Sequence, residues 1–317
     1  MTDLDVIGLS VLLDVPPEKL YMLSNDRDPR CRRKKDSYSN YHTVVIHRGK
    51  GRKNRVLSVP NVFLRAVQRR ILDRCLYKLP VSPYATAYRR GFSLLDNARP
   101  HVGKECIVKL DISGFFDSID DDMVYAVMRR FRLSVPASVL LTHLCIHNSV
   151  LPQGAPTSPY IANLVMKHFD EKLGAWCTQH GITYTRYCDD MTFSGTRDAI
   201  RNAQLIPKVR KMLSRQGFTL NDKKTVVVGV SRQQKVTGIV VNEKPQVPRK
   251  LRRSIRQEVY YCSKFGVKES LERRGSDIPP EQYLRSLLGR IGFALQTDRS
   301  NTEMQEYYSR IKELMKE

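Results

Sequence analysis

The chain has 317 residues and carries 54 Lys and Arg against 32 Asp and Glu, which gives a net charge of +22. Such an excess fits a partner with dense negative charge. Because no apolar run approaches the roughly 18 residues that span a bilayer and no signal peptide opens the chain, nucleic acid is a better candidate than a membrane. Seven cysteines without a C-x-x-C pair argue against zinc or a disulfide framework and predict a cytoplasmic protein.

The first hundred residues contain a strongly basic region. Residues 27–55 hold eleven Lys or Arg and two Asp. Residues 42–47 and 56–60 are predicted to be strands, and the basic segment 48–54 is the turn between them. A basic hairpin of this kind can reach over phosphate groups. The alternative for the basic run is an ordinary solvated surface.

Helices and strands are expected to alternate through the middle of the chain. An amphipathic helix is predicted at 61–79, followed by an irregular stretch at 82–103 and a short apolar strand at 106–111. The acidic run 120–122 precedes a helix at 123–131, where negative charge is favourable at the helix N-terminus. Further elements are expected in this order: a helix at 137–147, a helix from Ser158 to just before Gly181, a hairpin at 182–194, a helix at 198–216, and strands near 225–229 and 236–241.

The composition changes near residue 244. Pro245 and Pro248 bracket a linker, and a dense basic segment follows them at 249–256. The rest reads as helical, because apolar residues recur at helical spacing on one face. That face consists of Leu284, Leu287, Leu288, Ile291 and Leu295.

Adjacent carboxylates occupy the tip of the predicted hairpin. A two-residue hairpin turn normally uses Gly or Asn, whereas this one presents Asp189 and Asp190. Two like charges there are costly unless a cation is bound, although a solvated acidic turn is the alternative. Asp111 ends another apolar strand, and neighbouring strands could bring it beside Asp189. Three such carboxylates make a site for two hard cations such as Mg²⁺, which is the chemistry of nucleotidyl transfer.

Four segments in order resemble the motifs of reverse transcriptases. Tyr187-Cys188-Asp189-Asp190 is similar to the Tyr-x-Asp-Asp signature, and residues 110–116 resemble the first catalytic strand. Residues 151–159 resemble the Gln-Gly segment beside the incoming nucleotide, and residues 217–225 resemble the segment that places a lysine near the triphosphate. The resemblance covers roughly residues 50–245.

This resemblance implies roles for individual residues. Asp111, Asp189 and Asp190, with the backbone of Ile112, would ligate two Mg²⁺ ions. Phe116 would be the steric gate that excludes a ribose 2′-OH, unless it is plain core, and Lys223 is an alternative to Lys224 as the triphosphate lysine. The implied deoxynucleotide-binding residues are Arg55, Ile112, Ser113, Gly114, Phe115, Phe116, Gln153 and Lys224.

Two shorter elements resemble those of retron reverse transcriptases. They are Asn97-Ala98-Arg99-Pro100-His101 and Val236-Thr237-Gly238. Retron resemblance implies a cognate structured RNA that is both template and primer, priming from an internal 2′-OH, and a single-stranded DNA product (msDNA). It also implies a cellular RNase H, a separate effector protein and a role in bacterial antiphage defence. The expected RNA-binding residues are Asn97, His101, Val236, Thr237, Gly238, Arg249, Lys250, Arg252, Arg253 and Arg256.

The expected fold is α+β, in the form of a right-hand polymerase. Its fingers would comprise residues 1–105 with 148–165, its palm 106–243 with an antiparallel sheet, and its helical thumb 244–317. Two alternatives stay open within the class, a group II intron-like enzyme and a diversity-generating enzyme. The alternative from another class is a non-catalytic RNA-binding module, against which the three intact aspartates argue.

Overall fold

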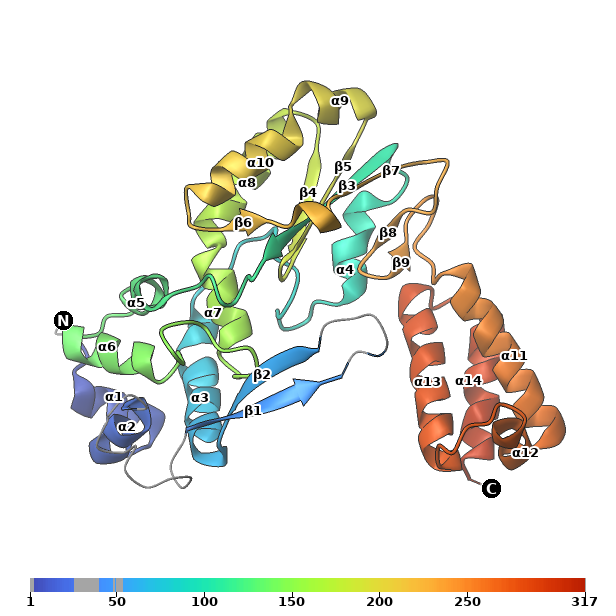
Figure 1. The fold of residues 1–317 in the computed structure, drawn as a ribbon, viewed down its shortest axis with the longest axis horizontal. Helices are drawn as coiled ribbons and strands as arrows, with labels where there is room; N and C mark the ends of the chain where they lie inside the picture. Colours follow the sequence, from blue (N-terminus) through green and yellow to red (C-terminus); the bar gives the residue numbers. More distant parts are fainter. Residues whose placement is uncertain (1–2, 26–39, 48, 50–53, 317) are drawn as a thin grey trace.

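A five-stranded antiparallel sheet lies at the centre of the largest part of the molecule (Figure 1). The computed structural model describes residues 3–25, 40–47, 49 and 54–316. Strand β3 is central, since it pairs with β5 on one side and with both β6 and β7 on the other. The sheet consists of β3 (Cys106–Ser113), β4 (Thr183–Tyr187), β5 (Asp190–Gly195), β6 (Thr219–Leu220) and β7 (Val226–Gly229).

The residues of β3 suit a central position in the sheet. The segment from Cys106 to Ile112 is buried except at Lys109, as its nearly continuous apolar run predicts. Helix α8 (Lys167–Gln179) packs against β4, and α10 (Leu205–Ser214) packs against α8 and β6. The same hydrophobic core extends through α5 (Asp121–Met128), α6 (Val135–His143) and α7 (Ser158–Val165).

The N-terminal helices share that core. The α1 (Val6–Leu13) and α2 (Pro17–Ser24) helices contact α6, and α3 (Val62–Arg74) contacts α1. The predicted hairpin is present as β1 (Tyr41–Ile46) and β2 (Arg55–Pro60), paired antiparallel. Most of its predicted basic turn, and the basic run at 30–35, lie outside the described residues.

Several predicted elements have different limits. Helix α3 ends at Arg74, where a short 3₁₀ turn, η2 (Leu76–Lys78), takes over before Leu79. The acidic run starts α5 rather than preceding it, because the Asp120 side chain accepts a hydrogen bond from the Met123 amide. The predicted long helix from Ser158 is divided at Met166 into α7 and α8. The helix predicted at 198–216 is divided into α9 (Arg197–Asn202) and α10, because Gln204 adopts a left-handed conformation with φ 47°.

Two short helical elements were missed, and one predicted strand was misread. The region predicted as irregular contains α4 (Leu94–Ala98) and the 3₁₀ turn η3 (Arg99–His101). The strand predicted at 236–241 is instead a small hairpin of β8 (Lys235–Val236) and β9 (Ile239–Val240). Its two turn residues, Thr237 and Gly238, both have positive φ, as a type I′ turn requires.

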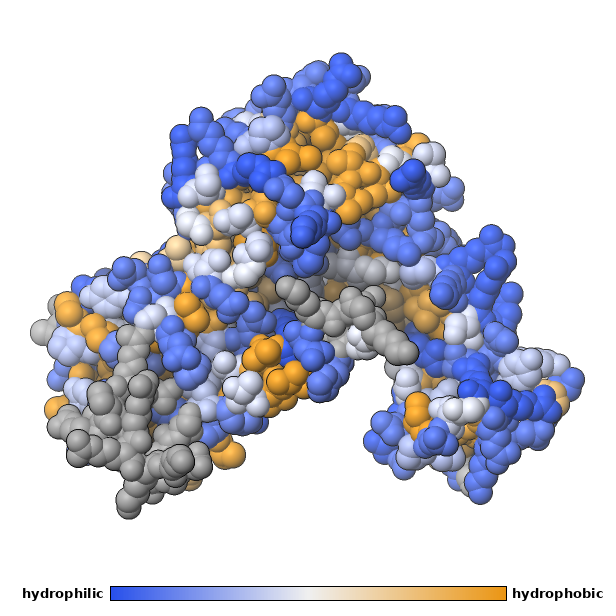
Figure 2. All heavy atoms as spheres, viewed as in Figure 1, coloured by the Kyte–Doolittle hydropathy of each residue, from blue (hydrophilic) through white to orange (hydrophobic). Residues whose placement is uncertain are grey.

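The C-terminal helices form a separate layer with their own core (Figures 1 and 2). They are α11 (Arg249–Phe265), α12 (Val267–Glu272), α13 (Pro280–Thr297) and α14 (Thr302–Leu314). Phe293 on α13 also packs against the small core beneath β8 and β9, which joins this layer to the sheet. None of the helices in the described part of the chain is long and apolar enough to cross a membrane. The α+β class and the antiparallel sheet predicted from the sequence are confirmed.

Candidate active site

Strand register brings the three aspartates together. Asp111 on β3 lies directly opposite Asp190 on β5, and the Ile112 amide donates a 3.1 Å hydrogen bond to the Asp189 carbonyl. Residues directly opposite in an antiparallel pair have Cβ atoms about 5 Å apart. Asp111 is therefore brought to the same end of the sheet as the adjacent pair Asp189 and Asp190.

The turn between β4 and β5 has a strained backbone. Tyr187 pairs with Asp190, so the turn consists of Cys188 and Asp189. Cys188 has φ 62° and is buried, although this left-handed conformation costs about 1–2 kcal/mol for a residue other than glycine. The position is one that type II′ turns usually give to glycine. The surrounding structure must therefore hold the turn in place.

Negative charge accumulates at this end of the sheet. Burial raises the pKa of Asp190, and the neighbouring charges of Asp189 and Asp111 raise it further. The ammonium of Lys224 opposes this effect, since its Nζ lies 2.7 Å from Asp111 Oδ2. Asn221 donates a 3.2 Å hydrogen bond from its Nδ2 to the other carboxylate oxygen, Oδ1. Of the two adjacent lysines in question, Lys224 is the one that contacts the site.

The donor chemistry suits a hard divalent cation. Carboxylate oxygens and a backbone carbonyl are the ligands that Mg²⁺ prefers, and their mutual repulsion would be relieved by binding it. Within the described ranges, however, no group of three His, Cys, Asp or Glu side chains is arranged to hold a metal ion. One oxygen of Asp111 is instead bound by Lys224. A metal ion that binds through this oxygen would compete with Lys224 for it.

The predicted nucleotide side of the site is also assembled. Arg55 on β2 donates a 3.1 Å hydrogen bond from its Nε to Gln153 Oε1, and the Ser58 amide donates to the Gln153 carbonyl. Gly154 has φ 133°, and a Cβ there would lie 2.8 Å from the Ser58 carbonyl oxygen. Only glycine allows the two segments to approach so closely. The hairpin and the Gln-Gly segment therefore form one unit.

The segment after Asp111 divides into an exposed and a buried half. Ser113 and Gly114 are exposed, so their backbone is available to a phosphate. Phe115 and Phe116 are buried, with ring centroids 5.6 Å apart. A buried ring beside the site is compatible with both roles that the sequence left open for Phe116. Its role as a steric gate stays a prediction.

The predicted RNA contacts of three residues are wrong, because the residues have no exposed surface. His101 lies between Ser194 Oγ at 2.7 Å and Thr185 Oγ1 at 2.8 Å, and burial lowers its pKa to about 3. Asn97 accepts a hydrogen bond from Thr86 Oγ1 and is buried. Val236 belongs to the small core beneath β8 and β9. Thr237 donates to the Leu94 carbonyl, and Gly238 is exposed.

The basic residues of α11 remain available to a polyanion. Arg249, Lys250 and Arg253 are exposed, while Arg252 is half-buried. Arg256 binds Glu303 on α14 with an Nε–Oε1 distance of 2.7 Å. The first turn of α11 contains no acidic residue, although positive charge is unfavourable at a helix N-terminus. A nearby anion would relieve this unfavourable charge.

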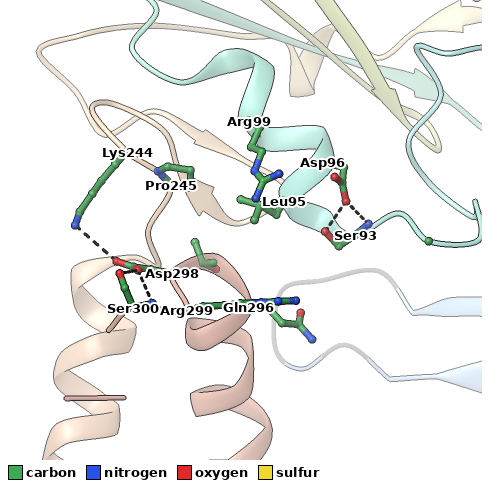
Figure 3. A pocket seen from close by; sticks show the side chains of 12 residues that line it. Ser93, Leu95, Asp96, Arg99, Lys244, Pro245, Gln296, Asp298, Arg299 and Ser300 are labelled. Atoms are coloured by element: carbon green, nitrogen blue, oxygen red, sulfur yellow. Dashed lines mark hydrogen bonds and ion pairs between the residues drawn. The ribbon is translucent and has the colours of Figure 1, made fainter. Parts of the chain in front are cut away.

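A groove of about 970 Å³ lies where α4 meets the end of α13 (Figure 3). Lys244 and Asp298 form an ion pair at 3.6 Å, while Ser93 and Asp96 cap α4. Arg99 and Arg299 add exposed cations. The sequence did not predict this groove, because its lining comes from three separate segments, at 91–99, 244–245 and 296–300.

Arg186 is a second feature that the sequence analysis missed. It lies on β4, two residues before the turn, and is fully buried with its partner Asp170 on α8. The available signal was a single charged residue in a strand whose other members are Thr and Tyr. Its partner could not be identified without knowing that α8 packs on β4.

Comparison with known proteins identifies the family. Residues 46–241 match the family described as reverse transcriptase (RNA-dependent DNA polymerase). The chain is 33% identical over 231 residues to the Retron Ec86 reverse transcriptase of Escherichia coli, which covers 70% of each chain. It is also 33% identical over 299 residues to the Retron Mx162 reverse transcriptase of Myxococcus xanthus, covering 84% of this chain but only 59% of that relative.

Solved structures give more distant likenesses. A telomerase from Candida albicans in complex with a fragment of telomeric RNA has a TM-score of 0.49 and 11% identity, covering 91% of this chain and 64% of that one. A foamy viral protease-reverse transcriptase in complex with double-stranded DNA has a TM-score of 0.47 and 15% identity, covering 89% and 45%. The sequence comparisons are sufficient for assignment: the chain belongs to the reverse transcriptase family, among its retron-type members, and is an RNA-directed DNA polymerase with the right-hand polymerase fold.

Proposed function

We propose that this enzyme copies a cognate structured RNA into single-stranded DNA with two Mg²⁺ ions held by Asp111, Asp189, Asp190 and the Ile112 carbonyl. The observation that carries the proposal is the register that places Asp111 opposite Asp190, beside Asp189. Bound Mg²⁺ would activate the attacking hydroxyl and stabilise the leaving oxygen. The raised pKa of Asp190 supports the proposal, because a crowded carboxylate gains most from a nearby cation.

The remaining residues would bind and orient the incoming deoxynucleotide. Arg55, held by Gln153, presents an exposed guanidinium to the triphosphate. The exposed backbone at Ser113 and Gly114 would hold phosphate oxygens, and Phe116 would lie against the sugar. Lys224 would exchange its contact with Asp111 for one with the triphosphate. The carboxylate is thereby freed when substrate and metal arrive together.

The three predicted subdomains form part of the proposal. The thumb, residues 244–317, is supported by the separate core of α11–α14. The palm, residues 106–243, contains the five-stranded sheet. The fingers, residues 1–105 with 148–165, contain the β1–β2 hairpin and the Gln-Gly segment. Fingers and palm share one continuous core, so we propose their boundary as functional rather than as a division between folding units.

The retron relatives support a specific primer and set of partners. In this proposal, synthesis starts from an internal 2′-OH of the RNA and yields msDNA. The exposed cations of α11 and the groove with Arg99 and Arg299 would dock the RNA. A cellular RNase H would trim the template, and a separate effector would act with the complex in antiphage defence.

The metal site is tested by replacing its carboxylates. Asp189→Asn or Asp190→Asn should lower DNA synthesis on a primed RNA template with Mg²⁺ at least about a hundredfold, because a lost metal ligand costs several kcal/mol of transition-state stabilisation. Asp198→Asn, on the exposed helix α9, is the matched control and should stay at wild-type activity. Activity of the site variants within tenfold of wild type would contradict the assignment.

The priming proposal is tested on the product. Nucleic acid that co-purifies with the wild-type enzyme is sequenced, and the 5′ end of its DNA is treated with a debranching enzyme. A debranching-sensitive 2′–5′ linkage to RNA is expected. A linear primer extended through an ordinary 3′–5′ linkage would favour the group II intron-like or diversity-generating alternatives. Absence of synthesis by the wild type on any template would favour the RNA-binding module.

A further inference from the structure

A buried guanidinium lies directly behind the turn that carries the aspartates. Arg186 on β4 donates from Nε to Asp170 Oδ1 at 2.9 Å and from Nη2 to Asp170 Oδ2 at 2.6 Å. Its remaining terminal nitrogen, Nη1, donates at 2.8 Å to the carbonyl of Cys188. One guanidinium therefore joins helix α8 to the turn between β4 and β5.

The carboxylate that orients this guanidinium is itself fixed. Asp170 accepts a 2.8 Å hydrogen bond from the Tyr184 hydroxyl in addition to the three from Arg186, the third being from Nε to Oδ2 at 3.2 Å. Asp170 and Arg186 have no exposed surface, and Tyr184 is 3% exposed. Apolar residues of similar volume often give equal stability in place of a buried ion pair. A contribution to stability therefore does not explain why the buried pair is present. The geometry of its hydrogen bonds offers an explanation.

That geometry acts on the turn backbone. The Cys188 carbonyl belongs to the peptide group that leads into Asp189, so fixing this oxygen fixes the direction in which the Asp189 side chain leaves the turn. Cys188 is held at φ 62°, a conformation that does not persist without support. The carbon of the same guanidinium lies 5.9 Å from the centroid of the Phe115 ring, in the segment that follows Asp111. Arg186 thus lies against both the Cys188 carbonyl, next to Asp189, and the Phe115 ring, near Asp111.

We propose that Arg186, oriented by Asp170, is a positioning residue that holds the Cys188–Asp189 turn in the geometry needed for metal binding. The proposal rests on the proposed function of Asp189 and Asp190. It makes no use of contact between Arg186 and substrate. The expected consequence of losing it is a folded protein with a loosened turn.

The main variant removes the whole buried polar group at once, so that no charge is left unpaired. It is Asp170→Leu with Tyr184→Phe and Arg186→Met. Tyr184→Phe alone is the matched control, because it keeps both the ion pair and the contact with the Cys188 carbonyl. A second control, Glu258→Leu with Arg290→Met, removes a partly exposed ion pair from the thumb and leaves the partly exposed Arg274 to solvent. The single variant Arg186→Lys keeps the positive charge but cannot reproduce the forked geometry.

The first readout requires no metal. Cys188 is buried, as are Cys145 and Cys177, so all three should react slowly with iodoacetamide in EDTA. In the triple variant and in Arg186→Lys we expect Cys188, measured by peptide mass spectrometry, to react about tenfold faster while the other two cysteines stay slow. Both controls should match the wild type. Equal acceleration at all three cysteines, or none at Cys188, in both variants would overturn the proposal.

The second readout is DNA synthesis on a primed RNA template. The triple variant should lose about a hundredfold in kcat and need several-fold more Mg²⁺ for half-maximal activity, because misplaced ligands weaken both steps. An unchanged Mg²⁺ requirement would overturn the positioning role. If the metal assignment itself were wrong, Asp189→Asn would stay active. The reactivity of Cys188 would still test the positioning role of Arg186, because that measurement needs no metal.

Discussion

The proposed palm, residues 106–243, and the proposed thumb, residues 244–317, each contain a buried carboxylate held by arginine, yet they place their proposed functional charges differently. In the palm, Asp170 and Arg186 are sealed from solvent, and the aspartates of the site are aligned by the register of β3 with β5. In the thumb, Glu258 binds Arg290 and Arg274, whose side chains are 31% and 36% exposed. The thumb cations proposed to bind RNA lie on the open surface of α11.

This difference separates two kinds of function. A site whose residues are positioned by strand register and buried hydrogen bonds tolerates little displacement. Substitutions in such a site should therefore abolish activity on every template. A surface formed by the charges of one helix face acts by long-range attraction. Substitutions there should therefore lower activity gradually, and the loss should depend on the salt concentration. In the proposed function, the first kind would determine whether chemistry occurs, and the second would hold the docked RNA in place.

The sharpest test of the comparison reverses charge on the thumb. Lys250→Glu with Arg253→Glu should lower synthesis on the cognate RNA about tenfold or more but lower synthesis on a generic primed template less than about threefold. These two residues are chosen because both are exposed, whereas Arg252 is half-buried and Arg256 is paired with Glu303. The measurement is the ratio of the two activities at several salt concentrations.

The matched control makes the same charge change on other thumb helices. Lys268→Glu on α12 with Arg285→Glu on α13 alters the net charge equally at exposed positions. It should leave the activity ratio near that of the wild type. If both double variants lower the ratio equally, the thumb contributes only general attraction and the docking role of α11 is wrong.

A smaller effect is expected inside the palm, at Phe116. Phe116→Val should raise ribonucleotide incorporation relative to deoxynucleotide incorporation several-fold, because a shorter side chain leaves room for the 2′-OH. Single-nucleotide incorporation with each sugar measures the ratio. Phe218→Val is the control, since its ring also packs beside Phe115 and its loss should cost similar stability. An unchanged ratio at Phe116 would assign its ring to the core alone.

The sequence indicated that the three aspartates lie close together, but it did not indicate which residues hold them in place. Asp111, Asp189 and Asp190 were predicted because acidic residues at the ends of apolar strands conflict with ordinary turn chemistry. The hairpin at 182–194 was predicted because its residues alternate. The register that sets Asp111 opposite Asp190 could not be predicted, since it depends on pairing across about 80 residues.

Buried polar residues were the main source of error. Asn97 and His101 are polar and occur in a short family element, so they read as surface contacts for RNA. In the structure their hydrogen bonds lie in the interior, where His101 joins η3 to β4 and β5. Arg186 was missed for the same reason, because its only visible signal was one charge among the Thr and Tyr residues of β4. Local sequence shows that a polar group needs a partner, but tertiary structure determines which one.

The smallest expected effect concerns pH, and it distinguishes palm from thumb. Burial lowers the pKa of His101 to about 3, and the charge of Lys104 adds to this, whereas an unfolded histidine titrates near pH 6.5. Between these values the unfolded chain binds the proton more readily. The stabilising contribution of neutral His101 is therefore complete above about pH 6.5 and is lost progressively as the pH falls toward 3.

The thumb carboxylate should respond only in more acidic solution. Burial favours protonated Glu258, but hydrogen bonds from Arg290 and Ser254 prevail and hold its pKa at about 2, below the usual 4.5. Its contribution is present above about pH 4.5 and is lost as the pH falls toward 2. From pH 6.5 to 4.5, His101 should thus weaken the palm while Glu258 leaves the thumb unchanged.

Trp176, the single tryptophan, lies on α8 and reports on the palm. Urea unfolding followed by its fluorescence should show a free energy of unfolding that decreases from pH 6.5 to 4.5, and His101→Gln should flatten this slope because glutamine does not titrate. Hydrogen exchange in peptides of α11 should stay constant over the same range. His180→Gln is the control for fluorescence, since that ring lies 4.4 Å from Trp176. If the free energy of unfolding of His101→Gln decreases with pH as steeply as that of the wild type, another titrating group causes the decrease. The neutral histidine that bridges β4 and β5 would then not account for the difference between palm and thumb.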